Sequence, residues 1–346
     1  MSVEEIRARL AAQRPRIEAR ADLTRRLRAF FERRGFLEVE TPRLTAHGTC
    51  EPYIEPFITS LEDDRGKNRV ASLIPSPEIH MKKLVASGYE RIWELARVFR
   101  NHEPLDSPWH NHQFSLLEWY RRGEPYETIM EDAQALILEL AGRDRLDWNG
   151  RGLDLSVFER LTVREAFRRF AGIDFDRELA EGPEGYWGGI RRLAERLGHG
   201  RQESLDDAFY LLFLNHVEPG LAAQDHPVFL HEYPAFQAAF SRLGPDPRYG
   251  ERVELYLAGV ELGNGYGELV DGEEQRKRLQ EGNQIRAQRG VPVLSMDPDF
   301  PQFLPEMGMT SGMAIGWDRL VMLLTGATSI DEVLLFPDRE IFARPS

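Results

Sequence analysis

The residues of this chain best suited to chemistry lie in one short run, from Glu261 to Gly267, which Glu268 closes. Residues 252–260 before it alternate like a strand, and Glu261 continues their apolar face. A carboxylate there is costly unless a cation, a metal ion or several donors meet it. Glycines at alternate positions of the run let the backbone approach a ligand closely. The run therefore indicates a ligand site, against the ordinary alternative of a solvated turn after an edge strand.

A second group of functional residues lies on residues 113–121, which read as a strand. Alternation places Phe114, Leu116, Glu118 and Tyr120 on one face, where they offer an aromatic plane, a charge and a hydroxyl. If that face is buried, Glu118 needs a cationic partner. The alternative is a solvated outer face. Arg100 closes the preceding strand, where a guanidinium can bind a carboxylate or a phosphate with two hydrogen bonds.

A third group is the segment from Gly312 to Arg319, an apolar turn flanked by glycines at the start of a helix. Such a turn suits close approach by an anion or a flat ring, although ordinary packing explains many of them. Taken together, the three groups and a further helix supply two arginines, an aromatic plane and four carboxylates: Glu78, Glu118, Glu261 and Glu268. This inventory suits a nucleoside triphosphate with Mg²⁺ and a substrate that carries amino groups.

Composition narrows the class of protein. The 44 Lys and Arg against 57 Asp and Glu give a net charge of −13, so no broad basic field is expected for nucleic acid. Cys50 is the only cysteine, which excludes an intrachain disulfide and a cysteine zinc cluster. No long apolar run or signal peptide is seen. We therefore expect a soluble cytoplasmic protein.

The elements that must position these residues follow from periodicity and punctuation. We expect helices at 3–34 (broken at Pro15), 76–88, 126–142, 273–289 and 317–324, and strands at 36–40, 92–99, 113–121, 228–233 and 252–260. Residues 43–70 read as irregular, 150–225 as mainly helical with a buried 206–217, and 312–316 as a turn. The pattern predicts one α+β domain over 1–346, with helices flanking an antiparallel sheet.

Five segments in order resemble the catalytic domain of class II aminoacyl-tRNA synthetases of the lysyl type. The three class signatures are matched by GFLEVETP (35–42), RVFRNHE with HNHQFSLLEWY (97–103 and 110–120) and GMAIGWDR (312–319). SPEIHMKKL (76–84) and ELGNGYGEL (261–269) are similar to the lysine-recognition and metal segments of that group. The resemblance spans about residues 20–340 and implies the class II catalytic fold, ATP as co-substrate and a homodimer formed through the first signature.

Two features point to one branch of this group. The first signature begins at residue 35, which leaves no room for the anticodon-binding domain expected before it in a lysyl-tRNA synthetase. Ala314 stands where the synthetases of this group have Gly and where the ligases that attach (R)-β-lysine to translation elongation factor P have Ala. An extra methyl in a pocket floor is worth about 1–3 kcal/mol in discrimination. The chain therefore resembles those ligases, with lysine or (R)-β-lysine as substrate and a lysine of elongation factor P as acceptor.

The resemblance also implies residue roles. Arg100 would contact the substrate carboxylate and the α-phosphate, and Arg319 the γ-phosphate and one face of the adenine. Glu261 would hold Mg²⁺, with Glu268 as a second candidate. The remaining ATP contacts would come from Asn101, His102, Asn111, Phe114, Leu262 and Gly316. The amino groups and pocket floor would involve Ser76, Glu78, Glu118, Tyr120, Glu268 and Ala314.

One departure concerns the second signature, where the family has Arg-Asn-Glu and this chain has Arg100-Asn101-His102 with Glu103 next. The family glutamate contacts the adenine amino group. Here either neutral His102 accepts that hydrogen bond or Glu103 takes the place. Three other functions stay open: the same adenylation with another amino acid or acceptor, a catalytically silent regulatory paralogue, and a true tRNA ligase.

Overall fold

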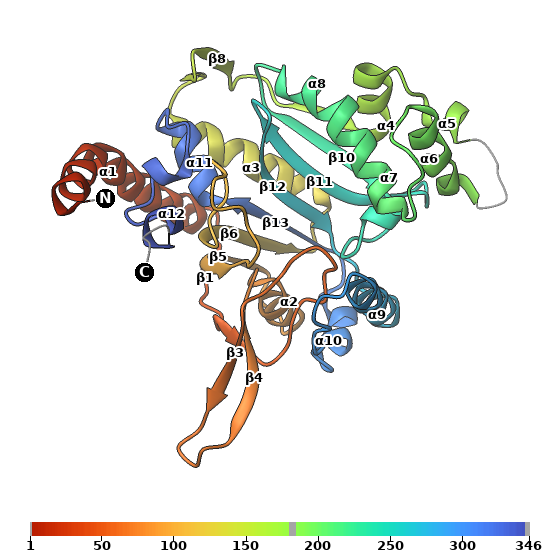
Figure 1. The fold of residues 1–346 in the computed structure, drawn as a ribbon, viewed down its shortest axis with the longest axis horizontal. Helices are drawn as coiled ribbons and strands as arrows, with labels where there is room; N and C mark the ends of the chain where they lie inside the picture. Colours follow the sequence, from red (N-terminus) through yellow and green to blue (C-terminus); the bar gives the residue numbers. More distant parts are fainter. Residues whose placement is uncertain (1, 180–184, 343–346) are drawn as a thin grey trace.

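The structure, a computed structural model, describes residues 2–179 and 185–342 and is built around one eight-stranded sheet (Figure 1). Neighbouring strands are antiparallel except at the two edges, where β1 pairs with β5 and β9 with β10 in parallel. The order across the sheet is β1 (Leu37–Glu38), β5 (Arg91–Phe99), β6 (Gln113–Arg122), β13 (Thr310–Gly316), β12 (Val260–Gly267), β11 (Tyr249–Leu257), β10 (Val228–Pro234) and β9 (Glu159–Thr162). This mostly antiparallel sheet with flanking helices confirms the predicted α+β class.

One face of the sheet packs against helices and forms the main core. Leu117 and Trp119 of β6 and Met313 and Ile315 of β13 point into it. There they meet α3 (Tyr126–Ala141) and α11 (Trp317–Leu324). α3 buries residues at helical spacing and ends at Gly142, whose φ of 63° suits a glycine. Because strand side chains alternate, burying these residues turns Glu118, Tyr120 and Ala314 toward the opposite face.

Helix α1 (Val3–Arg33) runs without interruption, so the predicted break at Pro15 is wrong. The carbonyl that Pro15 leaves without a partner belongs to Ala11, an exposed residue, so water can satisfy it. The second half of the helix buries Leu23, Leu27, Phe30 and Phe31, as their spacing predicts. The other helices outside the insertion are α2 (Glu78–Ala86), α9 (Gly272–Gln288), α10 (Phe300–Met307) and α12 (Asp338–Phe342).

The segment 43–70, predicted to be irregular, contains three strands that form a small sheet. β2 (Leu44–Thr45) and β3 (Ile58–Glu62) both pair with β4 (Asn68–Leu73), and the β3–β4 hairpin projects from the body of the protein (Figure 1). All five residues of β3 are exposed. In the hairpin only Ala71 and Ser72 of β4 are buried, so it has no apolar–polar alternation for sequence reasoning to detect.

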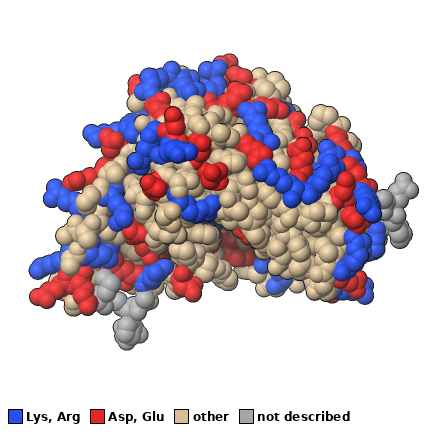
Figure 2. Space-filling view, turned by 90° about the horizontal axis from the view of Figure 1, so that it is seen from above, with Lys and Arg blue, Asp and Glu red and all other residues tan. Residues whose placement is uncertain are grey.

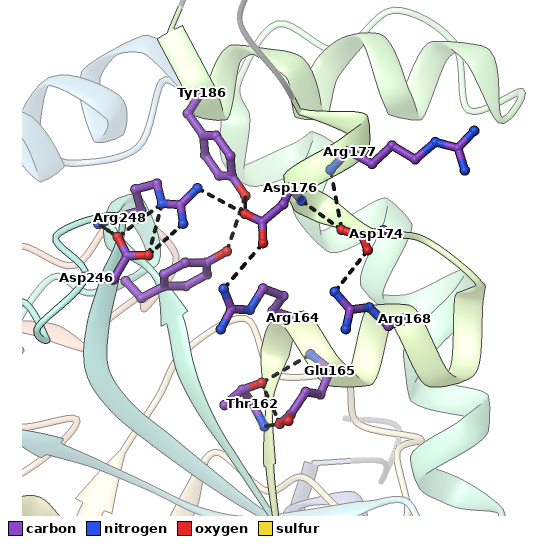
Figure 3. A network of polar contacts seen from close by, with 11 residues as sticks. Thr162, Arg164, Glu165, Arg168, Asp174, Asp176, Arg177, Tyr186, Asp246 and Arg248 are labelled. Carbon is purple, nitrogen blue, oxygen red and sulfur yellow. Dashed lines mark hydrogen bonds and ion pairs between the residues drawn. The ribbon is translucent and has the colours of Figure 1, made fainter.

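The mainly helical insertion begins at Val163, later than predicted. Before it lie the hairpin β7 (Arg145–Trp148) and β8 (Arg151–Asp154) and strand β9. The insertion comprises α4 (Val163–Ala166), α5 (Phe175–Glu178), α6 (Gly185–Arg196), α7 (Leu205–Leu212) and α8 (Glu218–Ala222), while 180–184 lie outside the described residues. The expected burial of 206–217 is confirmed at Phe209, Leu212 and Val217. Arg248 beside β11 anchors the insertion by pairing with Asp176 at 3.1 Å (Figure 3).

Two glycine-containing segments are strands: 312–316, which is predicted as a turn, and the run from Glu261 to Gly267, for which a solvated turn is the alternative to a ligand site. The expected strand 252–260 ends at Leu257 and turns at Ala258 and Gly259, which have φ of 53° and 82°, and the run after it is β12. Residues 312–316 lie within β13. These glycines stay extended because β12 and β13 each have a hydrogen-bonded strand on both sides. Across the described ranges, no helix is long and apolar enough to cross a bilayer.

Candidate active site

The open face of the sheet carries a cleft whose floor is made by β6, β13 and β12. In one cross-strand row Glu118 pairs with Ala314, which pairs with Asn264. Tyr120, Gly312 and Tyr266 form the next row. The central strand therefore has small residues between rows of large ones. This difference in side-chain size produces a groove along β13.

The cleft and the open solvent at its mouth together span about 1080 Å³ of space between the lining residues. The cleft gathers thirteen of the fifteen residues predicted for the site, and Asn101 and His102 do not line it. Residues as far apart in the sequence as Ser76 and Arg319 therefore line the same cleft. They meet because β6, β13 and β12 are neighbours in the sheet and α2 packs against β6.

At one end of the cleft lies a cluster of buried carboxylates, formed by Glu78, Glu118 and Glu268. Ser76 Oγ donates to Glu118 Oε2 at 2.8 Å, and Tyr120 Oη donates to Glu118 Oε1 at 2.6 Å. Burial, followed by the charge of Glu78, raises the pKa of Glu118 to about 8. Burial and the adjacent Glu118 also raise the pKa of Tyr120, so its hydroxyl stays protonated. A substrate ammonium would find two acceptors here and would favour the ionised carboxylate.

The same end contains a lysine that the sequence reasoning did not assign to the site. Lys82 Nζ contacts Glu78 Oε1 and lies 2.6 Å from Glu268 Oε2. Lys82 and Glu268 are each 1% exposed. Burial is the largest influence on the pKa of Lys82 and lowers it, but the two carboxylates outweigh it and leave a net upward shift. The spacing of Lys82 four residues after Glu78 on a helix was the available signal.

The other end of the cleft is cationic and aromatic. The Arg100 guanidinium lies 5.1 Å from the centre of the Phe114 ring, and its buried Nε has no hydrogen-bond partner among the described residues. Arg319 donates to the backbone carbonyls of Trp109 at 3.1 Å and Glu261 at 2.8 Å. Two guanidiniums beside an aromatic plane can bind phosphates and a purine ring.

The structure shows where His102 and Glu103, the residues that depart from the second signature, lie. His102 is exposed and has a φ of 61°, whereas Glu103 lines the cleft. Glu103 Oε2 lies 3.9 Å from His110 Nε2, and Arg319 contacts the same ring nitrogen at 3.1 Å. Burial, followed by Arg319 and Arg100, lowers the pKa of His110 to about 4. His110 is therefore a neutral ring at physiological pH, and Glu103 is the acidic group of this loop that faces the site.

The other residues predicted to contact the nucleotide differ in whether they are already engaged with other parts of the protein. Leu262 and Gly316 line the cleft directly. The Asn111 side chain is already engaged, since its Nδ2 donates to the Gln113 carbonyl at 2.6 Å and its Oδ1 accepts from the Asp338 amide at 2.8 Å. Asn101 pairs with Glu55 through a 2.6 Å backbone hydrogen bond. Asn111 and Asn101 thus shape the loop in this structure.

Glu261 is the carboxylate best placed for a metal ion. Its side chain opens to the cleft, and no hydrogen bond to its carboxylate is found within the described ranges. Glu254 on β11 does not line the cleft but an adjoining pocket that Glu261 also borders, and it accepts hydrogen bonds from Tyr233, Tyr256 and Arg252. No group of three or more metal-type side chains occurs in the part of the chain that the structure describes.

This donor set fits Mg²⁺ that is shared with phosphates. Mg²⁺ usually takes one or two carboxylates, several waters and substrate phosphates rather than a complete protein cage. Glu268, the second predicted metal residue, instead pairs with Lys82 at the carboxylate-rich end of the cleft. Sequence reasoning also missed Glu254, Asn264 and Tyr266, which alternation along β11 and β12 would have indicated had the strand boundaries been placed correctly.

Nearly the whole chain is similar to known proteins. The family pattern for tRNA synthetases class II (D, K and N) matches residues 4–340. An elongation factor P (R)-β-lysine ligase from Yersinia enterocolitica is 34% identical over 325 residues, covering 92% of this chain and 93% of that protein. The ligases of the same name from Yersinia pestis and Yersinia pseudotuberculosis are 34% identical over 329 residues, with the same coverage. With the pattern spanning nearly all of the described sheet and cleft, the chain belongs to the class II tRNA synthetase family, and its sheet is that family's catalytic fold.

Proposed function

We propose that this protein is an ATP-dependent ligase that activates (R)-β-lysine as an adenylate and transfers it to a lysine side chain of elongation factor P. The observation that carries the proposal is a single cleft with two guanidiniums and an aromatic ring at one end and three buried carboxylates at the other. A lysine-type amino acid has the complementary charges. The names of the relatives, which cover nearly the full chain, support the acceptor and the β-amino isomer.

In the first step the amino-acid carboxylate attacks the α-phosphorus of ATP, an oxygen–phosphorus bond forms and pyrophosphate leaves. Arg100 lies beside Phe114 at the cationic end of the cleft, where its guanidinium would contact both the carboxylate and the α-phosphate. Arg319 lines the same cleft and would pair with the terminal phosphate. Both charges stabilise the transition state by fixed positioning and neutralisation, and no covalent enzyme intermediate is needed.

Glu261 would hold Mg²⁺ against the phosphates. The ion would supply charge neutralisation of the pyrophosphate leaving group. Phe114 and Arg319 would lie on either side of the adenine, and Glu103 rather than His102 would meet its amino group. The adenine contact rests on Glu103 being the residue that lines the cleft.

In the second step the neutral ε-amine of the acceptor lysine attacks the adenylate carbonyl, an amide forms and AMP leaves. Meanwhile the substrate's own amino groups stay bound to Glu118, Tyr120 and the Glu78–Glu268 pair. Ala314 lies between Glu118 and Asn264 in the floor. Its methyl would crowd an α-amino group and leave room for a β-amino group, which is our reason for preferring the β isomer.

We also propose a homodimer, because the family's first signature forms an isologous contact and Leu37 of β1 is 51% exposed at the sheet edge. A tRNA acceptor is less favoured. On the described part of the face in Figure 2, cations and carboxylates are interspersed and no broad basic field is seen.

The deciding experiment is ATP–pyrophosphate exchange with (R)-β-lysine and α-lysine in parallel, followed by transfer to elongation factor P. We expect exchange that needs no tRNA, and covalent modification of elongation factor P alone. Exchange with lysine-type substrates but no transfer would assign another acceptor. Binding of ATP without exchange for any amino acid would support a silent regulatory protein and would refute the ligase.

A further inference from the structure

Lys82 takes an unusual position for a lysine, because it lies entirely inside the cluster that would bind the substrate's amino groups. Its ammonium touches Glu78 on its own helix and Glu268 at the end of β12. The Phe240 ring lies 4.8 Å from Nζ on a third side. With 1% of Lys82 exposed, water does not reach this ammonium. Lys82 therefore acts as a fixed charge of the site.

The charges at this end can be counted from the residues that face it. Glu78, Glu118 and Glu268 contribute three negative charges when ionised, and Lys82 contributes one positive charge. Glu51 also faces Glu78, but Arg100 and Arg252 oppose its charge. Bound substrate ammonium groups favour the ionised carboxylates, and the set of three carboxylates and one ammonium then has a net charge of −2. Two substrate ammonium groups would neutralise it.

We propose that Lys82 is a positioning residue that holds Glu78 and Glu268 in place and adjusts the charge of the cluster to match a diamino acid. The proposal rests on the ligase function above and adds to it the reason for selecting a substrate with two amino groups. Without Lys82, Glu78 and Glu268 would repel each other across a dry site and would rotate apart or take up protons. Either response would weaken binding of a dication.

A simpler, purely structural role for Lys82 makes different predictions. A lysine that only stabilises the fold would affect all substrates and both ends of the cleft equally when it is removed. A lysine that positions two carboxylates should affect the amino acid and not ATP, since the nucleotide residues Arg319 and Phe114 make no contact with it within the described ranges. The distinction can therefore be measured as separate changes in two KM values.

The experiment compares Lys82→Met with Lys83→Met in pyrophosphate exchange. Lys83 is the matched control because it is the next residue on α2 and pairs with Asp297, outside the cleft, at 2.6 Å. We expect Lys82→Met to raise the KM for (R)-β-lysine about a hundredfold, as for truncation of one partner in a buried ion pair. The KM for ATP should not change. The preference for the diamino acid over 6-aminohexanoic acid, which has one ammonium, should shrink at least tenfold.

A double variant keeps the proposal testable if Lys82→Met fails to fold. Lys82→Met/Glu268→Gln restores the net charge of −2, whereas Glu268→Gln alone has −1. The charge match predicts that the double variant binds the diamino acid more tightly than Glu268→Gln does. Weaker binding by the double variant, or an unchanged diamino preference in Lys82→Met, would overturn the proposal. Binding is measured by calorimetry without ATP, so a failed ligase function, seen as no exchange in the wild type, is distinguished from a failed role of Lys82.

Discussion

Gly312 is the position where one methyl group should do the most damage to amino-acid binding. A Cβ built there would lie 2.3 Å from Tyr120 Cε1 and 2.9 Å from Glu268 Oε1. The first distance is about 1 Å inside an ordinary carbon–carbon contact. Tyr120 is 3% exposed and belongs to the same buried cluster as Met81 and Phe240, so its ring has little room to retreat. We therefore expect Gly312→Ala to displace Tyr120 from its 2.6 Å hydrogen bond to Glu118.

The magnitude follows from two known effects. Overpacking a dense site costs about 1–3 kcal/mol, and a hydrogen bond to a charged group is worth about 1.5–3 kcal/mol. Even the lower values together predict a rise of about a hundredfold in the KM for the amino acid. The KM for ATP should stay close to the wild-type value, because the nucleotide end of the cleft lies at the opposite end of β13.

The assay is pyrophosphate exchange with the amino acid and ATP varied in turn, together with thermal unfolding to check the fold. Gly316→Ala is the control for adding a methyl to β13, because its Cβ would lie 3.5 Å from Arg319 Cδ, an ordinary contact. Gly316→Ala should leave the KM for the amino acid unchanged. A Gly312→Ala enzyme with normal amino-acid KM would show that Tyr120 and Glu268 do not form the amino-binding end.

Three further outcomes follow from the same cleft. Arg319→Ala and Glu261→Gln should each lower the exchange rate about a hundredfold or more. For Glu261→Gln the Mg²⁺ concentration needed for the half-maximal rate should also rise. Exchange at the wild-type rate by either variant would show that the nucleotide binds elsewhere. Ala314→Gly should raise α-lysine activation relative to (R)-β-lysine by about tenfold to a hundredfold, and an unchanged ratio would show that this methyl does not set the isomer preference. Burial is the largest cause that raises the pKa values of Glu118 and Glu268 to about 8. Between about pH 4.5 and 8 the folded protein therefore binds more protons than the unfolded chain. These two groups make the folded protein less stable as the pH rises through this range. Lysine should therefore raise the melting temperature more at pH 8.5 than at pH 6, and equal shifts at both pH values would contradict this.

The nature and approximate place of most helices and central strands could be predicted from the sequence. The alternation along 113–121 correctly placed Glu118 and Tyr120 opposite Leu117 and Trp119, because a strand in a layered domain has one core face. The α+β class and the family were also reached from the sequence, and the family comparison confirms them. The predicted boundaries of helices and strands were wrong where the prediction depended on a glycine or a proline, at Pro15, at Gly259 and in β13. There, tertiary hydrogen bonding and exposure outweighed the local preference of the residue.

The sequence by itself determined which side chains the protein has available for phosphates and amino groups. It could not determine which of them touch, because contacts such as Lys82 with Glu268 join residues far apart in the chain. Only the pairing of β13 with β6 and β12 places Ala314 between Glu118 and Asn264, and only the loop conformation turns Glu103 inward and His102 outward. The physical reason is that alternation fixes the face on which a side chain lies, whereas its neighbours depend on strand order and register, which hydrogen bonding and packing across the whole sheet decide.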